Sequence, residues 1–120
     1  MQRLAALALL VAALLLLPVA ARAAEVLQVR SAQLLQVGDH NRTYTVELAC
    51  LSLPPGGDQA ATDWLRDTLP RRTRVNLRPM GSHDGTLVAR VQRLGGDGPG
   101  SDLSEGLIAA GLAQPEPGCA

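Results

Sequence analysis

Aromatic side chains are almost absent from this sequence of 120 residues, which has one Trp, one Tyr and no Phe. Proteins that bind single-stranded nucleic acid without sequence preference stack the bases on several aromatic side chains. Trp64 lies on the apolar face of an expected helix, so we expect it in the core. A stacking platform is therefore largely missing, and single-stranded nucleic acid is disfavoured as the ligand.

An excess of positive charge is also lacking. Eleven basic residues balance eleven acidic ones, and every basic residue is an arginine. Arg3 and Arg22 belong to the predicted leader described below, so nine arginines would face eleven acids in the mature chain, a net charge of −2. Such a chain has no general attraction for nucleic acid or anionic membranes.

The N-terminal residues are typical of a signal peptide. A positive start ending at Arg3 precedes an apolar run of 14 residues, 4–17, and Ala21-Arg22-Ala23 has the small-x-small pattern of a cleavage site. A membrane-spanning helix needs about 20 apolar residues. We therefore predict that residues 1–23 are removed and that the protein is periplasmic, lumenal or extracellular, without membrane attachment. An uncleaved anchor is the alternative.

Only two cysteines are present, Cys50 and Cys119. Cysteines of exported proteins are normally paired, so we expect a disulfide between them. Closing so long a loop would stabilise the fold by about 4 kcal/mol on the chain-entropy model. The alternative for Cys50 is a buried apolar thiol, whereas Cys119 lies in a Pro/Gly-rich tail with nothing else to anchor it.

Alternating apolar residues predict five β-strands. The clearest is Tyr44 to Cys50, which ends before Pro54-Pro55-Gly56-Gly57. A turn at 38–41 should fold it back onto the preceding strand as a hairpin. The other strands are expected as one bent or two separate strands in 25–37, then 74–78, halted by Pro79, and 87–94 after a turn at 81–85.

Two helices are also expected. Asp58 is a candidate N-cap, and the apolar face behind it consists of Ala61, Trp64, Leu65, Thr68 and Leu69, before Pro70 ends the helix. After a flexible loop at 95–100, a short helix is expected over 102–110. Its candidate caps are Asp102 or Ser104, Gly111 stands at its stop position, and residues 114–120 form an extended tail.

The order β-β-β-α-β-β-α predicts a mainly β fold with two or three short helices, arranged as a five-stranded OB-fold barrel. The stretch Val46–Pro55, VELACLSLPP, resembles the V-R-L-x-x-I-D-A-P-E motif of the staphylococcal nuclease-like family. Leu107–Ala113, LIAAGLA, resembles that family's closing L-V-x-x-G-L-A. The resemblance runs from Val26 to Ala113 and implies an SNase-like OB-fold domain over 24–113, followed by the tail 114–120.

The resemblance implies a calcium-dependent cleavage of phosphodiester bonds, but the matching positions have lost the required chemistry. The two metal-binding aspartates fall on Gln33 and Ser52, and the catalytic glutamate falls on Pro55. The two phosphate-binding arginines fall on Glu47 and Thr86. Calcium needs charged oxygen ligands, and a proline cannot act as a base. We therefore expect no catalytic residues, no bound metal and no cofactor.

Two further groups of residues are candidates for a site. His40 and His83 lie in predicted turns, where solvated side chains are favoured over a metal pair or acid/base groups because no ligand cluster accompanies them. Four arginines form the other candidate, an anion-binding patch. The alternative is that these arginines are only solvated surface residues, on the outer face of a strand and in the loop before it. The four arginines are Arg71, Arg72, Arg74 and Arg78.

We conclude from the sequence that the chain is an exported domain that has lost nuclease activity and acts as a binding or structural module. We expect a monomer that binds an exported protein, whose identity the sequence does not specify. One alternative is a secreted calcium-dependent nuclease of DNA or RNA with a relocated site, for which Asp39 or Asp58 could supply a carboxylate. The other is a nucleic-acid-binding OB module, which would need the arginines and exposed aromatics on one face.

Overall fold

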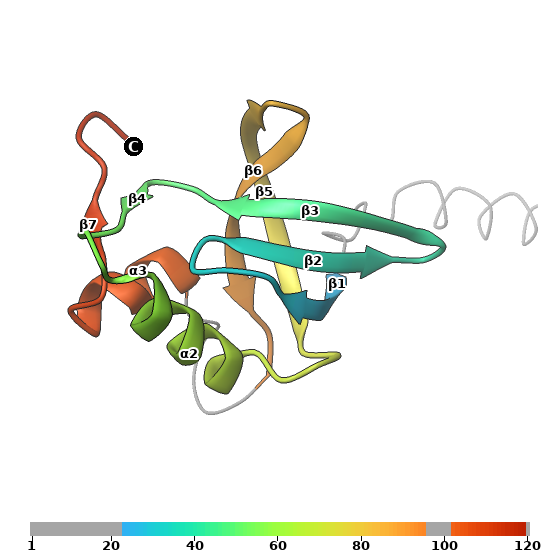
Figure 1. Cartoon of the computed structure of the whole chain (residues 1–120). Coiled ribbons are helices and arrows are strands. Elements are labelled where there is room, and N and C mark those ends of the chain that lie inside the picture. The colour runs from blue at the N-terminus through green and yellow to red at the C-terminus, as the bar shows by residue number, and fades with distance from the viewer. Residues whose placement is uncertain (1–22, 96–101, 120) are drawn as a thin grey trace, which may run out of the picture.

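The fold is a closed five-stranded barrel with two helices, seen in a computed structural model that describes residues 23–95 and 102–119 (Figure 1). The barrel order is β1-β2-β3-β6-β5, and β5 pairs with β1 to close it. All pairs are antiparallel except β3 with β6. The barrel strands are β1 (Ala23–Val29), β2 (Leu34–Asp39), β3 (Arg42–Leu48), β5 (Arg74–His83) and β6 (Thr86–Arg93).

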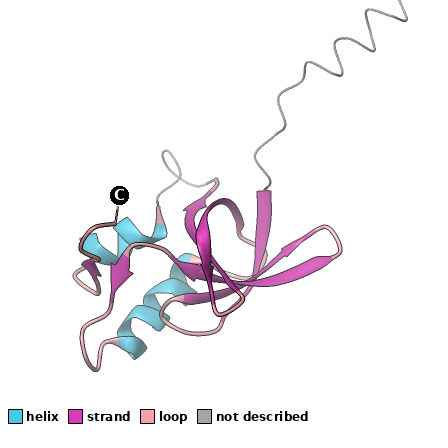
Figure 2. Ribbon diagram, turned by 90° about the horizontal axis from the view of Figure 1, so that it is seen from above, coloured by secondary structure: helices cyan, strands magenta, loops and turns pink. Residues whose placement is uncertain are grey.

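This strand order, with a helix between the third and fourth barrel strands, is OB-like, as the sequence predicts. The remaining elements are β4 (Leu51–Ser52), α2 (Asp58–Thr68), α3 (Leu103–Ala109) and β7 (Gln114–Pro115). Figures 1 and 2 show both helices at one end of the barrel, with the β2–β3 hairpin extending in the opposite direction. The short strands β4 and β7 pair outside the barrel.

The core lies inside the barrel and under the two helices. Alternate residues of each strand point inward, as the period of two predicts, and helix residues cover the open end. Burying each such aliphatic side chain contributes about 1.5–3 kcal/mol. The residues whose side chains are essentially inaccessible include Val26, Leu35, Val37, Val46, Val75 and Val91 from strands, and Leu65, Leu103 and Leu107 from helices.

Both predicted helices are confirmed, with one corrected cap. Gly57 is the N-cap of α2 and makes no side-chain cap bond, so Asp58 is the first helical residue rather than the cap. Its carboxylate still lies in the first turn, where negative charge is favourable. Asp102 caps α3 by accepting a hydrogen bond of 3.0 Å from the backbone N–H of Glu105. Gly111 follows with φ +75°, the left-handed stop position.

Three strand boundaries differ from the sequence prediction. The strand that starts near Tyr44 ends at Leu48 instead of Cys50, because Cys50 has φ +67° and cannot continue a ladder. Pro79 does not halt β5, since it sits where the register with β6 shifts, and prolines are tolerated at such bulges. The following turn contains only Asp84 and Gly85, both with positive φ, the pattern of a two-residue hairpin.

The predicted disulfide is confirmed: Cys50 and Cys119 are bonded, with 5.4 Å between their Cα atoms. Residues 1–22 of the predicted leader 1–23 and residues 96–100 of the predicted loop 95–100 lie outside the described residues. The cleavage site predicted after Ala23 falls within β1, where Ala23 pairs with Asn76. No helix among residues 23–95 and 102–119 is long and apolar enough to cross a membrane.

Candidate functional site

Two of the five positions that the resemblance assigns to catalysis lie side by side on the barrel. Gln33 precedes β2, and the next residue, Leu34, pairs with Glu47 of β3. The backbone N–H of Leu48 donates a hydrogen bond of 2.8 Å to the carbonyl oxygen of Gln33. The fold therefore places Gln33, at an expected metal-binding position, next to Glu47, at an expected phosphate-binding position.

A cavity of about 350 Å³ opens beside this pair. It lies between the β1–β2 loop, the end of β3, the β5–β6 hairpin and the C-terminal segment. In OB folds, the loop between the first two strands and the hairpin joining the last two barrel strands flank the ligand-binding face. The cavity thus occupies the usual OB ligand position. The polar side chains that line it are Gln33, Glu47, His83 and Glu116.

Three of these four side chains already lie close to a polar partner. The amide Nε2 of Gln33 donates to the carbonyl oxygen of Leu51 over 3.1 Å. His83 Nδ1 lies 3.7 Å from Glu47 Oε2, and His83 Nε2 lies 3.5 Å from Asp84 Oδ2. The imidazole is 69% exposed and the Glu47 side chain 28% exposed. Solvent screens such a pair, so it adds little stability.

The residues of this cavity do not fit the calcium site that the resemblance implies. Gln33 offers only a neutral oxygen, and calcium affinity depends on charged carboxylates. Glu47 and Glu116 are the two carboxylates in the lining. Within the described part of the chain, no group of three or more His, Cys, Asp or Glu side chains is placed to hold a metal ion. No arginine lines the cavity either.

The other three family positions lie outside the cavity. Ser52 and Pro55 are exposed, and Ser52 pairs with Gln114 in the small outer sheet. Thr86 lines a separate hollow with the start of β3. The parallel register of β3 and β6 instead places Val88 opposite Glu47. The residue directly across from Glu47 is therefore apolar, and Thr86 does not face it.

The carboxylates considered for a relocated nuclease site are also outside the cavity. Asp39 lies at the far end of β2, where it accepts a hydrogen bond of 3.0 Å from the hydroxyl of Tyr44. Asp58 begins α2 and is exposed. His40, whose side chain is 90% exposed, is 3.7 Å from Asp39 and lines a different cavity from His83. The two histidines therefore do not share a site.

The four candidate arginines are all exposed, and none lines the cavity. Arg71 and Arg72 lie in the turn before β5, whereas Arg74 and Arg78 alternate along its outer face. Arg78 lies directly across from Arg90 of β6. Arg90 itself pairs with Asp102 over 3.2 Å. None of the four candidates makes an ion pair within residues 23–95 and 102–119.

Sequence analysis considers His83 only beside His40 and does not single out Glu116, so it places neither residue in this cavity. His83 was expected as a solvated turn residue, yet it is the last residue of β5 and borders the hairpin that flanks the site. The Asp-Gly pair after it was the signal, because it predicts a two-residue hairpin. Glu116 lies in a segment that the disulfide bonds to Cys50, so the predicted cysteine pairing was the signal that could have placed it near the cavity.

By structure, the chain is a small OB-like barrel. The face that binds ligands in other OB folds carries the Glu47–His83 pair here and is bordered by the disulfide-bonded tail. The chain matches no protein-family model and no curated protein sequence. The resemblance to the staphylococcal nuclease-like family therefore depends on the motifs quoted above and on the OB-like order of the strands.

Proposed function

We propose that this chain is an exported, nuclease-like OB domain that has lost catalysis and acts as a binding module for another exported protein. The signal-peptide pattern supports export, as does the disulfide between Cys50 and Cys119. The cavity on the OB ligand face is the place where we expect binding. Its polar lining consists of side-chain amide, carboxylate and imidazole groups, which suit hydrogen bonding to a polypeptide.

One observation carries the proposal: Glu47, paired with His83, lines the cavity where phosphodiester chemistry would need a cation. A phosphoryl transition state is stabilised by arginines and metal ions that neutralise its growing negative charge. A carboxylate at the same place repels a phosphate. This argument applies equally to cleavage and to tight binding of nucleic acid in the cavity.

The nucleic-acid-binding alternative is less favoured for a second reason. The exposed arginines of β5 lie outside the cavity, and both aromatic side chains of the sequence, Tyr44 and Trp64, are half-buried against the core. Bases would have no aromatic side chain in the cavity on which to stack. Nothing in the described residues specifically favours a relocated nuclease, whose candidate carboxylates lie outside the cavity.

A nuclease assay tests the loss of catalysis. The purified mature chain, residues 24–120, is incubated with single- and double-stranded DNA and RNA, in calcium and in chelator, beside an active calcium-dependent nuclease. We expect no cleavage by the folded protein. Calcium-dependent cleavage that co-elutes with the folded protein would overturn the proposal.

A binding experiment tests the role of the cavity. Immobilised protein is offered the exported proteins of its source, and any retained protein is then titrated in purified form. The proposal expects Glu47→Arg to weaken that binding at least about tenfold, roughly 1.4 kcal/mol. Arg78→Ala is the matched control, since it changes an exposed charge outside the cavity. Equal binding by both variants would place the interface elsewhere.

A further inference from the structure

The last segment of the chain, residues 114–119, is attached to the fold by very few non-covalent contacts. We call it the C-terminal strap. Its six residues are all exposed. Its two β7 residues pair with β4, but one of them is Pro115, which has no N–H to donate. One further backbone bond, from Glu116 N–H to the carbonyl oxygen of Cys50, spans 3.2 Å.

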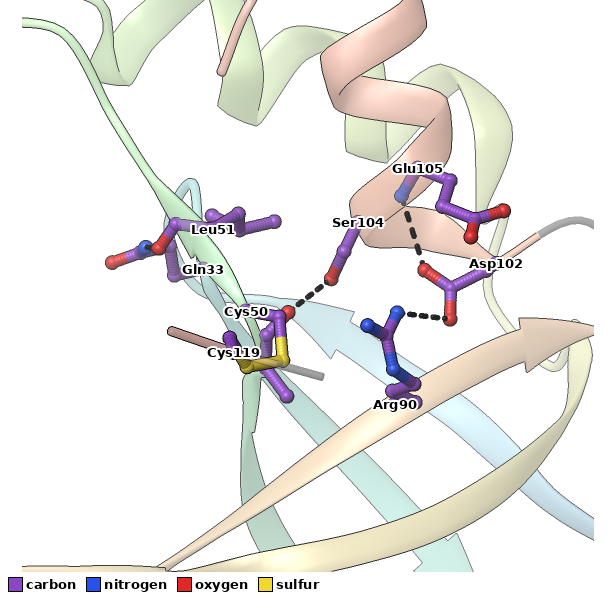
Figure 3. The surroundings of a disulfide bond; sticks show 9 residues. Gln33, Cys50, Leu51, Arg90, Asp102, Ser104, Glu105 and Cys119 are labelled. Carbon is purple, nitrogen blue, oxygen red and sulfur yellow. Dashed lines mark hydrogen bonds and ion pairs between the residues drawn. A yellow bond between two sulfur atoms is a disulfide. The ribbon is translucent and has the colours of Figure 1, made fainter. Parts of the chain in front are cut away.

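The strap nevertheless forms one wall of the candidate site. Glu116 lines the cavity together with Cys50. The strap is covalently bonded to Cys50 through Cys119 (Figure 3). Cys50 is 8% exposed, whereas Cys119 is on the surface. The disulfide is therefore the main attachment of a surface segment that closes the side of a ligand-binding face.

The barrel under the strap is held by contacts that do not involve it. The backbone N–H of Ala49 donates to the carbonyl oxygen of Ala89 over 2.9 Å. The carbonyl oxygen of Ala49 accepts the buried hydroxyl of Ser104 at 2.6 Å, and Gln33 bonds to Leu51 (Figure 3). Loss of the disulfide would leave these bonds in place.

We propose that the C-terminal strap is a redox-released cover of the candidate site, closed by the Cys50–Cys119 disulfide and opened by a dithiol protein. A thiolate of the dithiol attacks the sulfur of the exposed residue Cys119, and the Cys50 thiolate leaves. The second thiol of the dithiol then attacks the mixed disulfide and releases Cys119. Two electrons pass from the dithiol to the disulfide, and the two protons of the dithiol end on Cys50 and Cys119.

Release of the strap would change the site in two ways. The Glu116 carboxylate would leave the cavity, and the edge of β4 would lose its only partner in the small sheet formed by described residues. A freed strand edge offers backbone donors and acceptors to an incoming extended segment. The inference that the open site binds a protein partner rests on the proposed function, whereas the inference that the strap opens does not rest on it.

Amide hydrogen exchange, followed by NMR on the processed protein before and after reduction, tests the opening. In the reduced protein, we expect the Glu116 amide to exchange at the rate of an unstructured peptide. The amides of Leu48 and Ala49, which bond within the barrel, should stay at least about 100-fold slower than that rate. Two results would each overturn the proposal: a Glu116 amide that stays protected after reduction, or barrel amides that lose protection together with it.

Two variants make the test specific. The double variant Cys50→Ser/Cys119→Ser should show the open pattern without any reductant. Glu116→Gln keeps the disulfide and should show the closed pattern, which separates release of the strap from loss of the Glu116 charge. An open double variant that binds no partner would leave the strap proposal intact and count against the proposed function. A closed double variant would overturn the strap proposal alone.

Discussion

The buried hydroxyl of Ser104 donates a hydrogen bond of 2.6 Å to the carbonyl oxygen of Ala49, 55 residues earlier in the chain. Ser104 is 1% exposed and lies in the first turn of α3. Ala49 is the residue at which the chain leaves β3 and bends toward the candidate site. This single bond therefore joins the helical end of the fold to the wall of the cavity.

Replacing Ser104 with Ala should lower the free energy of unfolding by about 1–3 kcal/mol, because the buried carbonyl of Ala49 would lose its side-chain donor. Urea denaturation of the two proteins measures the difference. Ser82→Ala is the control, since Ser82 is exposed on β5 and a change there should cost less than about 0.5 kcal/mol. Equal losses in the two variants would show that the Ser104 bond has no special role.

Asp102 has two roles that substitutions can separate. It caps α3 through the Glu105 amide, and it pairs with Arg90 over 3.2 Å, with both side chains less than a quarter exposed. Asp102→Asn keeps a capping oxygen, whereas Asp102→Ala removes both interactions. We expect the Ala variant to lose about 1–3 kcal/mol in thermal or urea unfolding and the Asn variant to lose less. An Asn variant as unstable as the Ala variant would assign the effect to the ion pair.

The architecture was predictable because local patterns and chain order agree. Period-two apolar residues such as Val46 and Leu48 point inward, and the helix face with Ala61 and Leu65 is buried as expected. The strand boundaries were less predictable, since they depend on the backbone conformation of single residues, which composition does not reveal. Cys50 adopts a positive φ although it is not glycine, and a bulge accommodates Pro79 within a strand.

The candidate site was predictable only in part. Chain order placed Gln33 and Glu47 together, since the residue after Gln33 pairs with Glu47. The assignment of Thr86 came from the local sequence Asp84-Gly85-Thr86, which carries no information about its distance from β3. The register between β3 and β6 puts Val88 opposite Glu47. Parallel pairing of distant strands is not encoded by any local turn, so motif comparison could not show which residue of β6 faces Glu47.

Gly106 of α3 packs against the only tryptophan of the chain. A Cβ atom at this position would lie 2.7 Å from the ring carbon Cη2 of Trp64. Gly106→Ala should therefore destabilise the protein by about 1–3 kcal/mol through overpacking, despite the better helix propensity of Ala. Urea unfolding followed by Trp64 fluorescence measures the effect.

A second background isolates the contact between Gly106 and Trp64. In a Trp64→Leu protein the ring is gone, so Gly106→Ala should become neutral or stabilising by up to about 1 kcal/mol. Circular dichroism replaces fluorescence as the probe in this background. A loss of the same size in both backgrounds would attribute the effect to the helix itself and not to the ring.

Glu47 should be replaceable without loss of the fold, which is what a binding residue in an open cavity requires. Its pair with His83 joins atoms 3.7 Å apart at a largely exposed imidazole, so Glu47→Gln should change the free energy of unfolding by less than about 1 kcal/mol. Leu48→Ala is the matched control one residue along the same strand. Leu48 is 2% exposed, and its truncation should cost about 2–5 kcal/mol. If Glu47→Gln were as destabilising as Leu48→Ala in urea unfolding, Glu47 would be a structural residue, and weaker partner binding by its variants would no longer point to the cavity.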